Sequence, residues 1–286
     1  MTIEPNSVPA GAATMFPETP YGIVKRLRTV ERWAALVAEW RAKKVLSILD
    51  YGCGTGDHVT YPLACLGHQV LGVDYHAASI EEAGRRFSLP NLSFRVADVD
   101  LLVREGAIFD LVVCSEVLEH LQEPLPFLRQ VSRMMGKKGG LIITTPNGYG
   151  SFEWLCSLER LLDRIGMNRL LRKARRAFRA GAADERMSNE CSPNGPSTIG
   201  FLNVDSKHVQ FFALAELESL FVQSGFRIAE RQARTLLCGP YADILFQLMP
   251  WKQSLYRLNN EIADRLPMAW AADWMYLLQP DGTTVS

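Results

Sequence analysis

Two glutamates and a histidine with helical spacing are the residues of this sequence whose side chains most plainly suggest chemistry. Glu116, Glu119 and His120 stand at positions i, i+3 and i+4, so a helix through them would place all three side chains on one face. Carboxylate and imidazole groups bind Mg²⁺, Mn²⁺, Fe²⁺ or Zn²⁺, and three protein ligands leave positions open for a substrate oxygen. We therefore interpret the three residues as candidate metal ligands and Glu119 and His120 also as candidate catalytic residues.

His208 is the candidate fourth ligand. It comes just before a segment that we expect to be a helix, and in a parallel α/β topology such a position returns to the carboxyl edge of the sheet. Without a metal, either His120 or His208 is a candidate general base, because an imidazole titrates near neutral pH. The alternative for all four residues is structural, with the glutamates capping a helix and the histidines packed beside the sheet.

A glycine-rich turn follows a short apolar run at residues 45–51. Gly52, Gly54 and Gly56 allow positive φ angles and let the backbone approach a bound ligand closely. Asp57 stands where a dinucleotide-binding fingerprint would have its third glycine. The spacing therefore predicts a nucleotide-like ligand other than NAD.

Acidic and polar residues close the next strand-like runs. Asp74 ends the run at residues 70–74, about 20 residues after the glycine turn, which is the spacing at which a carboxylate binds ribose hydroxyls. Asp98 follows the run at 92–96, and Ser115 follows the run at 109–114. Taken singly, each acid also has a structural explanation that is equally good. Asp98 could be the N-cap of a helix, and Asp74 could be a turn residue at the surface. Taken together, they predict one site along a common sheet edge.

The elements that would position these residues alternate between helix and strand. Apolar periodicity predicts helices at 23–43 and 214–223, the first of them over the cofactor side. It also predicts a fifth strand at 142–146, a sixth strand at 226–237 and a last strand at 270–278 that pairs with the sixth. This order predicts an α/β fold with a doubly wound, seven-stranded, mostly parallel sheet and helical insertions.

The glycine turn, the acids at the strand ends and the segment Phe-Asp-Leu-Val-Val-Cys-Ser-Glu-Val-Leu-Glu-His-Leu occur in the order found in one enzyme family. Over about residues 45–237 the chain resembles the class I S-adenosylmethionine-dependent methyltransferases. The resemblance implies that S-adenosylmethionine is the cofactor. It also implies nine cofactor-binding residues, which are Asp50, Gly52, Cys53, Gly54, Asp74, Tyr75, Asp98, Val99 and Ser115.

The two glutamates, the histidine and the later histidine are also similar to a constellation in two methyltransferase subfamilies. These are the ubiquinone-biosynthesis O-methyltransferases and the small-RNA 3′-terminal 2′-O-methyltransferases. The resemblance implies that Mg²⁺, Mn²⁺ or Zn²⁺ is held by Glu116, Glu119, His120 and His208, and that a hydroxyl of a small-molecule acceptor is methylated. RNA 2′-O-methylation, N- or C-methylation and a non-catalytic cofactor-binding protein docked on membranes are the alternatives.

Composition and charge set the remaining expectations. The formal net charge is zero, so nucleic acid is a disfavoured partner, and neither a membrane span nor a signal peptide is apparent. The six cysteines have no metal-ligand spacing, which favours reduced thiols and a cytoplasmic protein.

Three segments lie outside the regular alternation. Residues 1–19 are expected to be disordered, and residues 20–286 are expected to form one domain with insertions at 148–206 and 240–267 that shape the acceptor site. The basic, amphipathic stretch at 157–179 is a candidate for peripheral membrane contact, for contact with nucleic-acid phosphates or for a solvated face. The segment at 181–205 is a candidate mobile loop.

Overall fold

Seven strands form a single mixed sheet in the computed structural model, which describes residues 16–150, 209–238, 246 and 249–282. The strand order is β3-β2-β1-β4-β5-β7-β6. The strands are β1 (Ser47–Tyr51), β2 (Gln69–Asp74), β3 (Leu92–Val96), β4 (Phe109–Ser115), β5 (Met135–Pro146), β6 (Phe226–Ala233) and β7 (Asp273–Pro280). Strands β1 to β5 are parallel, and β7 runs antiparallel to both β5 and β6. The predicted α/β fold class is confirmed.

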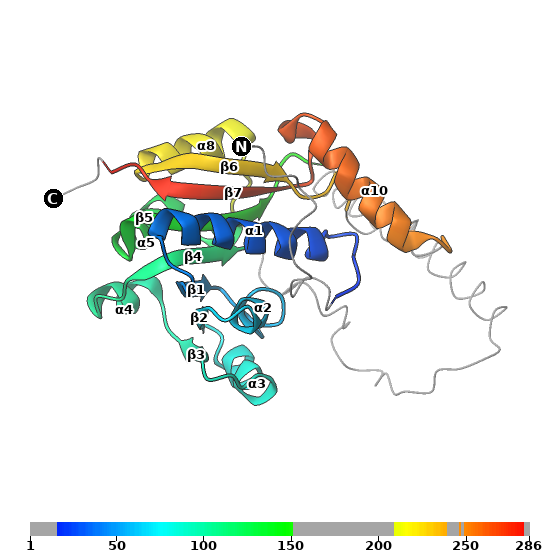
Figure 1. Ribbon diagram of the computed structural model, residues 1–286. Coiled ribbons are helices and arrows are strands. Elements are labelled where there is room, and N and C mark those ends of the chain that lie inside the picture. The colour runs from blue at the N-terminus through cyan, green and yellow to red at the C-terminus, as the bar shows by residue number, and fades with distance from the viewer. Residues whose placement is uncertain (1–15, 151–208, 239–245, 247–248, 283–286) are drawn as a thin grey trace.

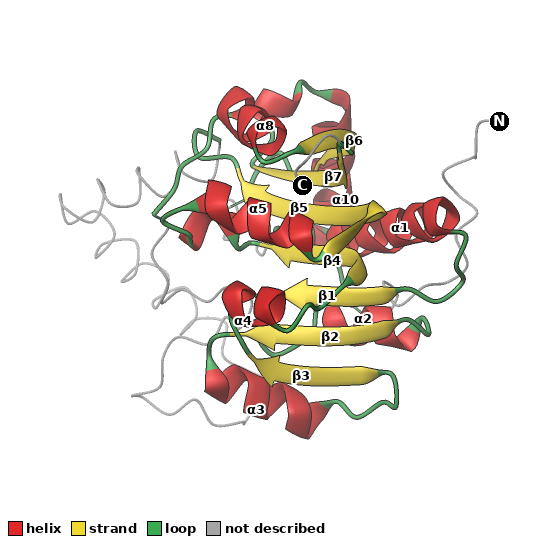
Figure 2. Cartoon of the chain, turned by 90° about the vertical axis from the view of Figure 1, so that its left-hand side faces the viewer, coloured by secondary structure: helices red, strands yellow, loops and turns green. Residues whose placement is uncertain are grey.

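Helices cover both faces of this sheet (Figure 2). Helix α1 (Ile23–Arg41) and α2 (Thr60–Cys65) pack on one face, while α4 (Val99–Arg104), α5 (Pro124–Arg133) and α8 (Leu214–Gln223) pack on the other. Helix α3 (Ala77–Arg86) packs along β2 and β3, and α10 (Lys252–Arg265) packs against β6. Two short 3₁₀ turns, η2 (Leu118–His120) and η3 (Met268–Trp270), complete the described elements.

The apolar stripe of α1 explains its place on the sheet. Val30, Trp33 and Val37 recur at helical spacing and are fully buried against the centre of the sheet. A Cβ on Gly140 of β5 would lie 2.4 Å from Cγ2 of Val37, so the helix lies directly on the strand at this glycine. The expected helix at residues 23–43 is therefore confirmed to within two residues.

The reversal of β7 brings distant parts of the chain to one edge of the sheet. Pro146, the last residue of β5, pairs with Asp273, the first residue of β7, and Trp274 pairs with Ala233, the last residue of β6. The end of β6 and the start of β7 therefore join the carboxyl ends of β1 to β5. This common edge is on the right in Figure 1, where α10 also lies.

Several predicted boundaries differ from the observed ones. The helix at 214–223 is confirmed, but β5 begins at Met135 rather than at 142. The sixth strand ends at Ala233 instead of 237, because the chain leaves the ladder where β7 begins. The last strand begins at Asp273 and not at Trp270, which belongs to η3 and is largely exposed.

The N-terminal boundary also differs from the expectation. Glu18, which we expected in a disordered segment, is 8% exposed, and its carboxylate accepts hydrogen bonds from the backbone N–H groups of Val24 and Lys25 at the start of α1.

The remaining expectations concern segments that the structure covers in part. The segments at 157–179 and 181–205 lie outside the described residues, as do 240–245 and 247–248. Helix α10 lies within the segment 240–267, where a helical insertion was expected. In the part of the chain that is described, no helix has the length and apolar character needed to cross a membrane.

Candidate active site at the carboxyl edge of the sheet

The glycine turn after β1 begins the candidate site. Gly52 and Gly54 have φ angles of 78° and 54°, in the left-handed region that favours glycine. The N–H groups of Gly52 and Cys53 both donate to the carbonyl oxygen of Val73, at 2.7 and 3.0 Å, which fixes the turn on β2. A Cβ on Gly54 would meet no heavy atom within 4 Å. The space in front of Gly54 is therefore open to a ligand.

Asp74, the last residue of β2, lies directly beside this turn. Its Oδ2 accepts a hydrogen bond from the N–H of Gly54 at 2.9 Å, and its Oδ1 accepts one from the N–H of His76 at 2.8 Å. A carboxylate oxygen has a second lone pair, so both oxygens can still accept from ribose hydroxyls. The neighbouring Tyr75 is 76% exposed, which leaves its ring available to an adenine.

Asp98 and Val99 lie where β3 passes into α4. The Oδ1 of Asp98 accepts a hydrogen bond from the N–H of Leu101 at 2.7 Å, so Asp98 is the N-cap of α4. Asp98 therefore has the helix-capping role that the sequence allowed as the alternative to cofactor binding. Because the side chain is exposed and Oδ2 has no partner among the described residues, the cap leaves this oxygen free to accept another hydrogen bond.

Asp50 is a buried acid beneath the glycine turn. Its Oδ2 accepts a hydrogen bond from the hydroxyl of Thr60 at 2.6 Å. Burial raises the pKa of this carboxyl to about 6, against the opposing effects of Thr60 and Arg26. Burial also raises the pKa of the Cys53 thiol, so Cys53 offers the site a neutral thiol rather than a thiolate.

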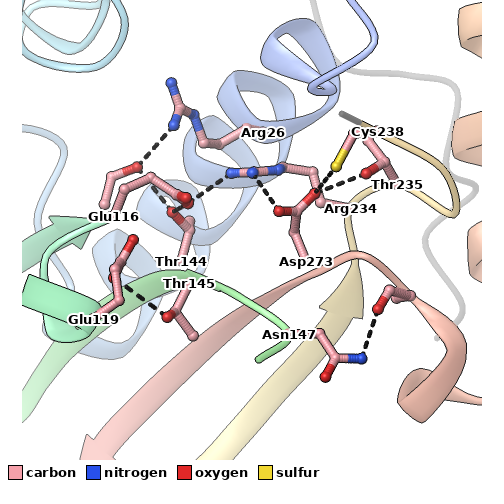
Figure 3. A network of polar contacts seen from close by, with 12 residues as sticks. Arg26, Glu116, Glu119, Thr144, Thr145, Asn147, Arg234, Thr235, Cys238 and Asp273 are labelled. Atoms are coloured by element: carbon pink, nitrogen blue, oxygen red, sulfur yellow. Dashed lines mark hydrogen bonds and ion pairs between the residues drawn. The ribbon is translucent and has the colours of Figure 1, made fainter. Parts of the chain in front are cut away.

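Arg26 of α1 is a site residue that the sequence analysis missed. Its Nη1 donates to the hydroxyl oxygen of Ser115 at 3.1 Å, so α1 places a guanidinium beside the end of β4 (Figure 3). Burial and the nearby Arg234 lower its pKa to about 10, which leaves it charged at neutral pH. The only signal in the sequence was a basic residue in a helix expected over the cofactor side.

The segment after β4 is not the expected helix. Glu116 has a φ angle of 57°, and only the 3₁₀ turn Leu118–His120 follows it. The prediction that Glu116, Glu119 and His120 share one helix face is therefore wrong. A non-glycine residue in the left-handed region costs about 1 kcal/mol, so other contacts must hold Glu116 there.

Two side chains hold the carboxylate of Glu116 (Figure 3). Its Oε1 accepts from Nη1 of Arg234 at 2.7 Å and from the hydroxyl of Thr144 at 2.6 Å. Burial by itself would raise the pKa of Glu116, but Arg234, Arg26 and Thr144 outweigh that effect and lower it. Glu116 is thus an ionised partner of arginine.

Glu119 has the opposite environment. It is 1% exposed, its Oε2 accepts only a long hydrogen bond of 3.3 Å from Thr145, and its Oε1 has no hydrogen-bond partner in the described structure. Burial and the charge of Glu116 raise its pKa well above the ordinary value. Both effects favour the protonated form of Glu119, which is the form that can donate a hydrogen bond.

The described residues do not by themselves form the metal site that the resemblance implied. Among the described residues, no three acid, imidazole or thiol side chains converge as metal ligands, and His208 lies outside the described residues. The carboxylate of Glu116 is already paired with a guanidinium through its Oε1. His120 ends η2 and is half-buried, and it remains a candidate base.

Comparison with known proteins finds relatives that match part of the chain. The chain is similar to the ubiquinone biosynthesis O-methyltransferase of Bartonella tribocorum, with 35% identity over 104 residues. It is 36% identical to the mitochondrial ubiquinone biosynthesis O-methyltransferase of Rattus norvegicus over 108 residues. The matches cover 36% of this chain in both cases, and 42% and 31% of the two relatives, so the chain spans less than half of either relative.

Solved structures share the fold at low identity. A candidate sarcosine dimethylglycine methyltransferase from Galdieria sulphuraria has a TM-score of 0.52 at 14% identity, with 90% of this chain and 88% of that chain covered. PKMT2 from Rickettsia typhi has a TM-score of 0.51 at 14% identity, with 85% and 50% covered.

The family itself is shown by a match along most of the chain. The sequence profile of the methyltransferase domain matches residues 24–231, which include the glycine turn, the acids at the strand ends and the turn after β4. The chain therefore belongs to the S-adenosylmethionine-dependent methyltransferase domain family.

Proposed function

We propose that this protein transfers the methyl group of S-adenosylmethionine to an oxygen of a hydroxylated small molecule. The observation that carries the cofactor assignment is the contact between Asp74 and the N–H of Gly54, because it places a carboxylate beside an open, glycine-lined space at the carboxyl edge. The choice of oxygen as the acceptor atom rests on the partial similarity to O-methyltransferases.

The residues around this space match the charges of the cofactor. Asp74 and the exposed ring of Tyr75 would hold the ribose and adenine, with Asp98 and Val99 at the far end of the base. Arg26 and Ser115 would meet the carboxylate of the methionine part, and Asp50 its ammonium. When bound, S-adenosylmethionine supplies an electrophilic methyl group on its sulfonium sulfur.

The chain must bring an acceptor oxygen in line with that methyl group and accept its proton. The new bond joins the acceptor oxygen to the methyl carbon as the carbon–sulfur bond breaks, and the hydroxyl proton passes to a base. His120 is the candidate base in the described structure, because it ends the turn that also carries Glu119. In its protonated form, which burial favours, Glu119 can donate a hydrogen bond to a second oxygen of the acceptor.

Glycine variants test the cofactor site. Gly54 and Gly67 both have positive φ angles, 54° and 89°, and a Cβ at either position would meet no heavy atom within 4 Å. Alanine at either position should therefore destabilise the fold by a similar amount, about 1 kcal/mol. Only Gly54→Ala should reduce the affinity for S-adenosylhomocysteine in calorimetry, by about a hundredfold, because its methyl group enters the ligand space.

Product identity tests the acceptor. The full chain is incubated with S-adenosylmethionine and a panel of catechols, with and without apolar tails, together with amines and activated carbon acids. We expect S-adenosylhomocysteine release with the catechols and O-methylated products in mass spectra. Methylation confined to nitrogen or carbon would contradict O-methylation, and retained cofactor affinity in Gly54→Ala would contradict the site.

A further inference from the structure

Arg234 is a buried charge at the carboxyl edge that pairs with two carboxylates. It follows the last residue of β6, and its side chain is 4% exposed. Its Nη1 donates to Glu116 at 2.7 Å, and its Nη2 lies 2.8 Å from Oδ1 of Asp273 at the start of β7. Figure 3 shows the guanidinium between these two carboxylates. One arginine thus joins the turn after β4 to the start of β7.

The far side of this pairing is itself anchored. Asp273 accepts a hydrogen bond from the hydroxyl of Thr235 at 2.7 Å, and the thiol of Cys238 lies 3.8 Å from the same oxygen. The backbone N–H of Arg234 also donates to the carbonyl oxygen of Asp273 at 3.0 Å. These contacts with Asp273 of β7 orient the guanidinium of Arg234. The carboxylate of Glu116 binds the guanidinium in that orientation.

The near side of the pairing shapes the candidate active site. Glu116 takes its left-handed conformation where Arg234 and Thr144 bind its carboxylate. The next residue, Val117, packs against the glycine turn, since a Cβ on Gly52 would lie only 2.6 Å from Cγ2 of Val117. Two residues later comes the buried Glu119. Holding Glu116 therefore positions both the wall of the cofactor turn and the acid on the acceptor side.

We propose that Arg234 is the fixed cation of this site, a positioning residue that neutralises Glu116 where a divalent metal would otherwise bind. The inference deepens the proposed function, on which it rests, by assigning metal-independent methyl transfer. A cation bound to Glu116 would share this carboxylate with the guanidinium of Arg234, whose Nη1 lies 2.7 Å from Oε1, and two positive charges on one buried carboxylate repel strongly. Arg234 supplies the positive charge without needing an exchangeable ion.

Manganese binding tests this assignment apart from turnover. The full chain, free of cofactor, is titrated with Mn²⁺ and followed by electron paramagnetic resonance and calorimetry. Wild type should show no saturable binding up to millimolar Mn²⁺. Arg234→Gln removes the guanidinium and leaves Glu116 unneutralised, so its Mn²⁺ affinity should exceed that of wild type by about tenfold or more. Arg234→Lys, which keeps the charge, should behave as wild type.

Arg231→Gln is the matched control. Arg231 belongs to the same strand and also forms an ion pair, with Glu218, but its side chain is 51% exposed and it does not approach Glu116. This variant should leave Mn²⁺ binding unchanged. A general loosening of the β6 edge would affect both variants, whereas the proposal predicts a gain only for Arg234→Gln.

Two outcomes would overturn the proposal. Saturable Mn²⁺ binding by wild type that is lost in Glu116→Gln would show that Glu116 serves a metal despite Arg234. A folded Arg234→Gln without increased Mn²⁺ affinity would show that the guanidinium is not what excludes the cation. If Arg234→Gln does not fold, titrations of the wild type, Arg234→Lys and Glu116→Gln still show whether Glu116 binds Mn²⁺ in the presence of a positive charge at position 234. Failure to bind S-adenosylhomocysteine or to methylate any acceptor would instead contradict the proposed function.

Discussion

At the scale of single residues, the two glutamates after β4 show how strongly position controls carboxyl chemistry. Glu116 and Glu119 are three residues apart, yet one is held ionised by Arg234 and the other is buried with one oxygen that has no partner among the described residues. Their pKa values accordingly move in opposite directions. Two carboxyl groups with such different environments suit different tasks, one structural and one directed at the acceptor.

The raised pKa of Glu119 makes stability depend on pH. Because the folded state holds the proton more tightly than the unfolded state, this residue's contribution is fully present below the unfolded pKa and is lost as the pH rises towards the folded pKa. Glu119→Gln keeps the shape and removes the titration. The variant should therefore gain stability relative to wild type as the pH rises above about 4.5, at up to ~1.4 kcal/mol per pH unit.

Urea unfolding at pH 5 and pH 8 would measure this effect. Glu261→Gln, at an exposed glutamate of α10, is the control and should give the same difference from wild type at both pH values. A constant difference between Glu119→Gln and wild type across this range would show that Glu119 is ionised in the folded protein.

At the scale of elements, the close contact of α1 with β5 decides where Arg26 and Ser115 meet. Gly140 permits this contact because its missing Cβ leaves room for Val37. Gly22, with a φ angle of 63°, begins the helix, and a Cβ there would lie 2.8 Å from Cγ2 of Thr235 and 2.9 Å from Cγ of Arg234. Two glycines thus let one helix approach both the sheet and the end of β6.

A pair of glycine-to-alanine variants tests this packing. Gly140→Ala should destabilise the protein by about 2 kcal/mol, because the new methyl group overlaps Val37 and forces α1 outward. Gly84→Ala, at an exposed helical glycine of α3 with open space around it, should instead stabilise by about 0.5–1 kcal/mol. Thermal and denaturant unfolding would compare the two, and equal effects would refute the proposed contact.

At the scale of the whole molecule, Glu18 ties the start of the described chain to both α1 and α10. Besides capping α1, its Oε2 accepts a hydrogen bond from the side-chain amide of Asn260 at 2.9 Å, and its carbonyl oxygen accepts one from Gln253 at 3.1 Å. Lys25 adds an ion pair of 2.8 Å with Asp264. These contacts attach α10 to the N-terminal end of α1, close to the residues of the candidate site.

Two truncations separate this role from that of the preceding residues. A chain that lacks residues 1–15 keeps all the contacts of Glu18, whereas one that lacks residues 1–19 loses them. The longer deletion should lower the free energy of unfolding by about 2 kcal/mol relative to the shorter one, since it leaves buried hydrogen-bonding groups unpaired and also removes the packing of Phe16 on Val24 and Leu27. Calorimetric unfolding of both chains would measure the difference, and equal stability would show that Glu18 does not hold α10.

The sequence by itself determined the features that depend on neighbours along the chain. The glycine turn at 52–56, Asp74 and Asp98 at the ends of strands and the helix at 214–223 follow from local periodicity and spacing, and the structure places them as expected. The helix through Glu116 was wrong because the local pattern does not include Arg234, whose ion pair favours a left-handed turn instead.

Only the tertiary structure decided which charges meet at the site. Arg26, Ser115, Glu116 and Arg234 come from α1, the end of β4, the turn after it and the end of β6, and the antiparallel β7 brings Asp273 to the same edge. Burial of charged groups is tolerated only where opposite charges and hydrogen bonds compensate it. The hydrogen bond between Glu116 and Arg234 joins residues 118 positions apart, so no local pattern in the sequence could have indicated it.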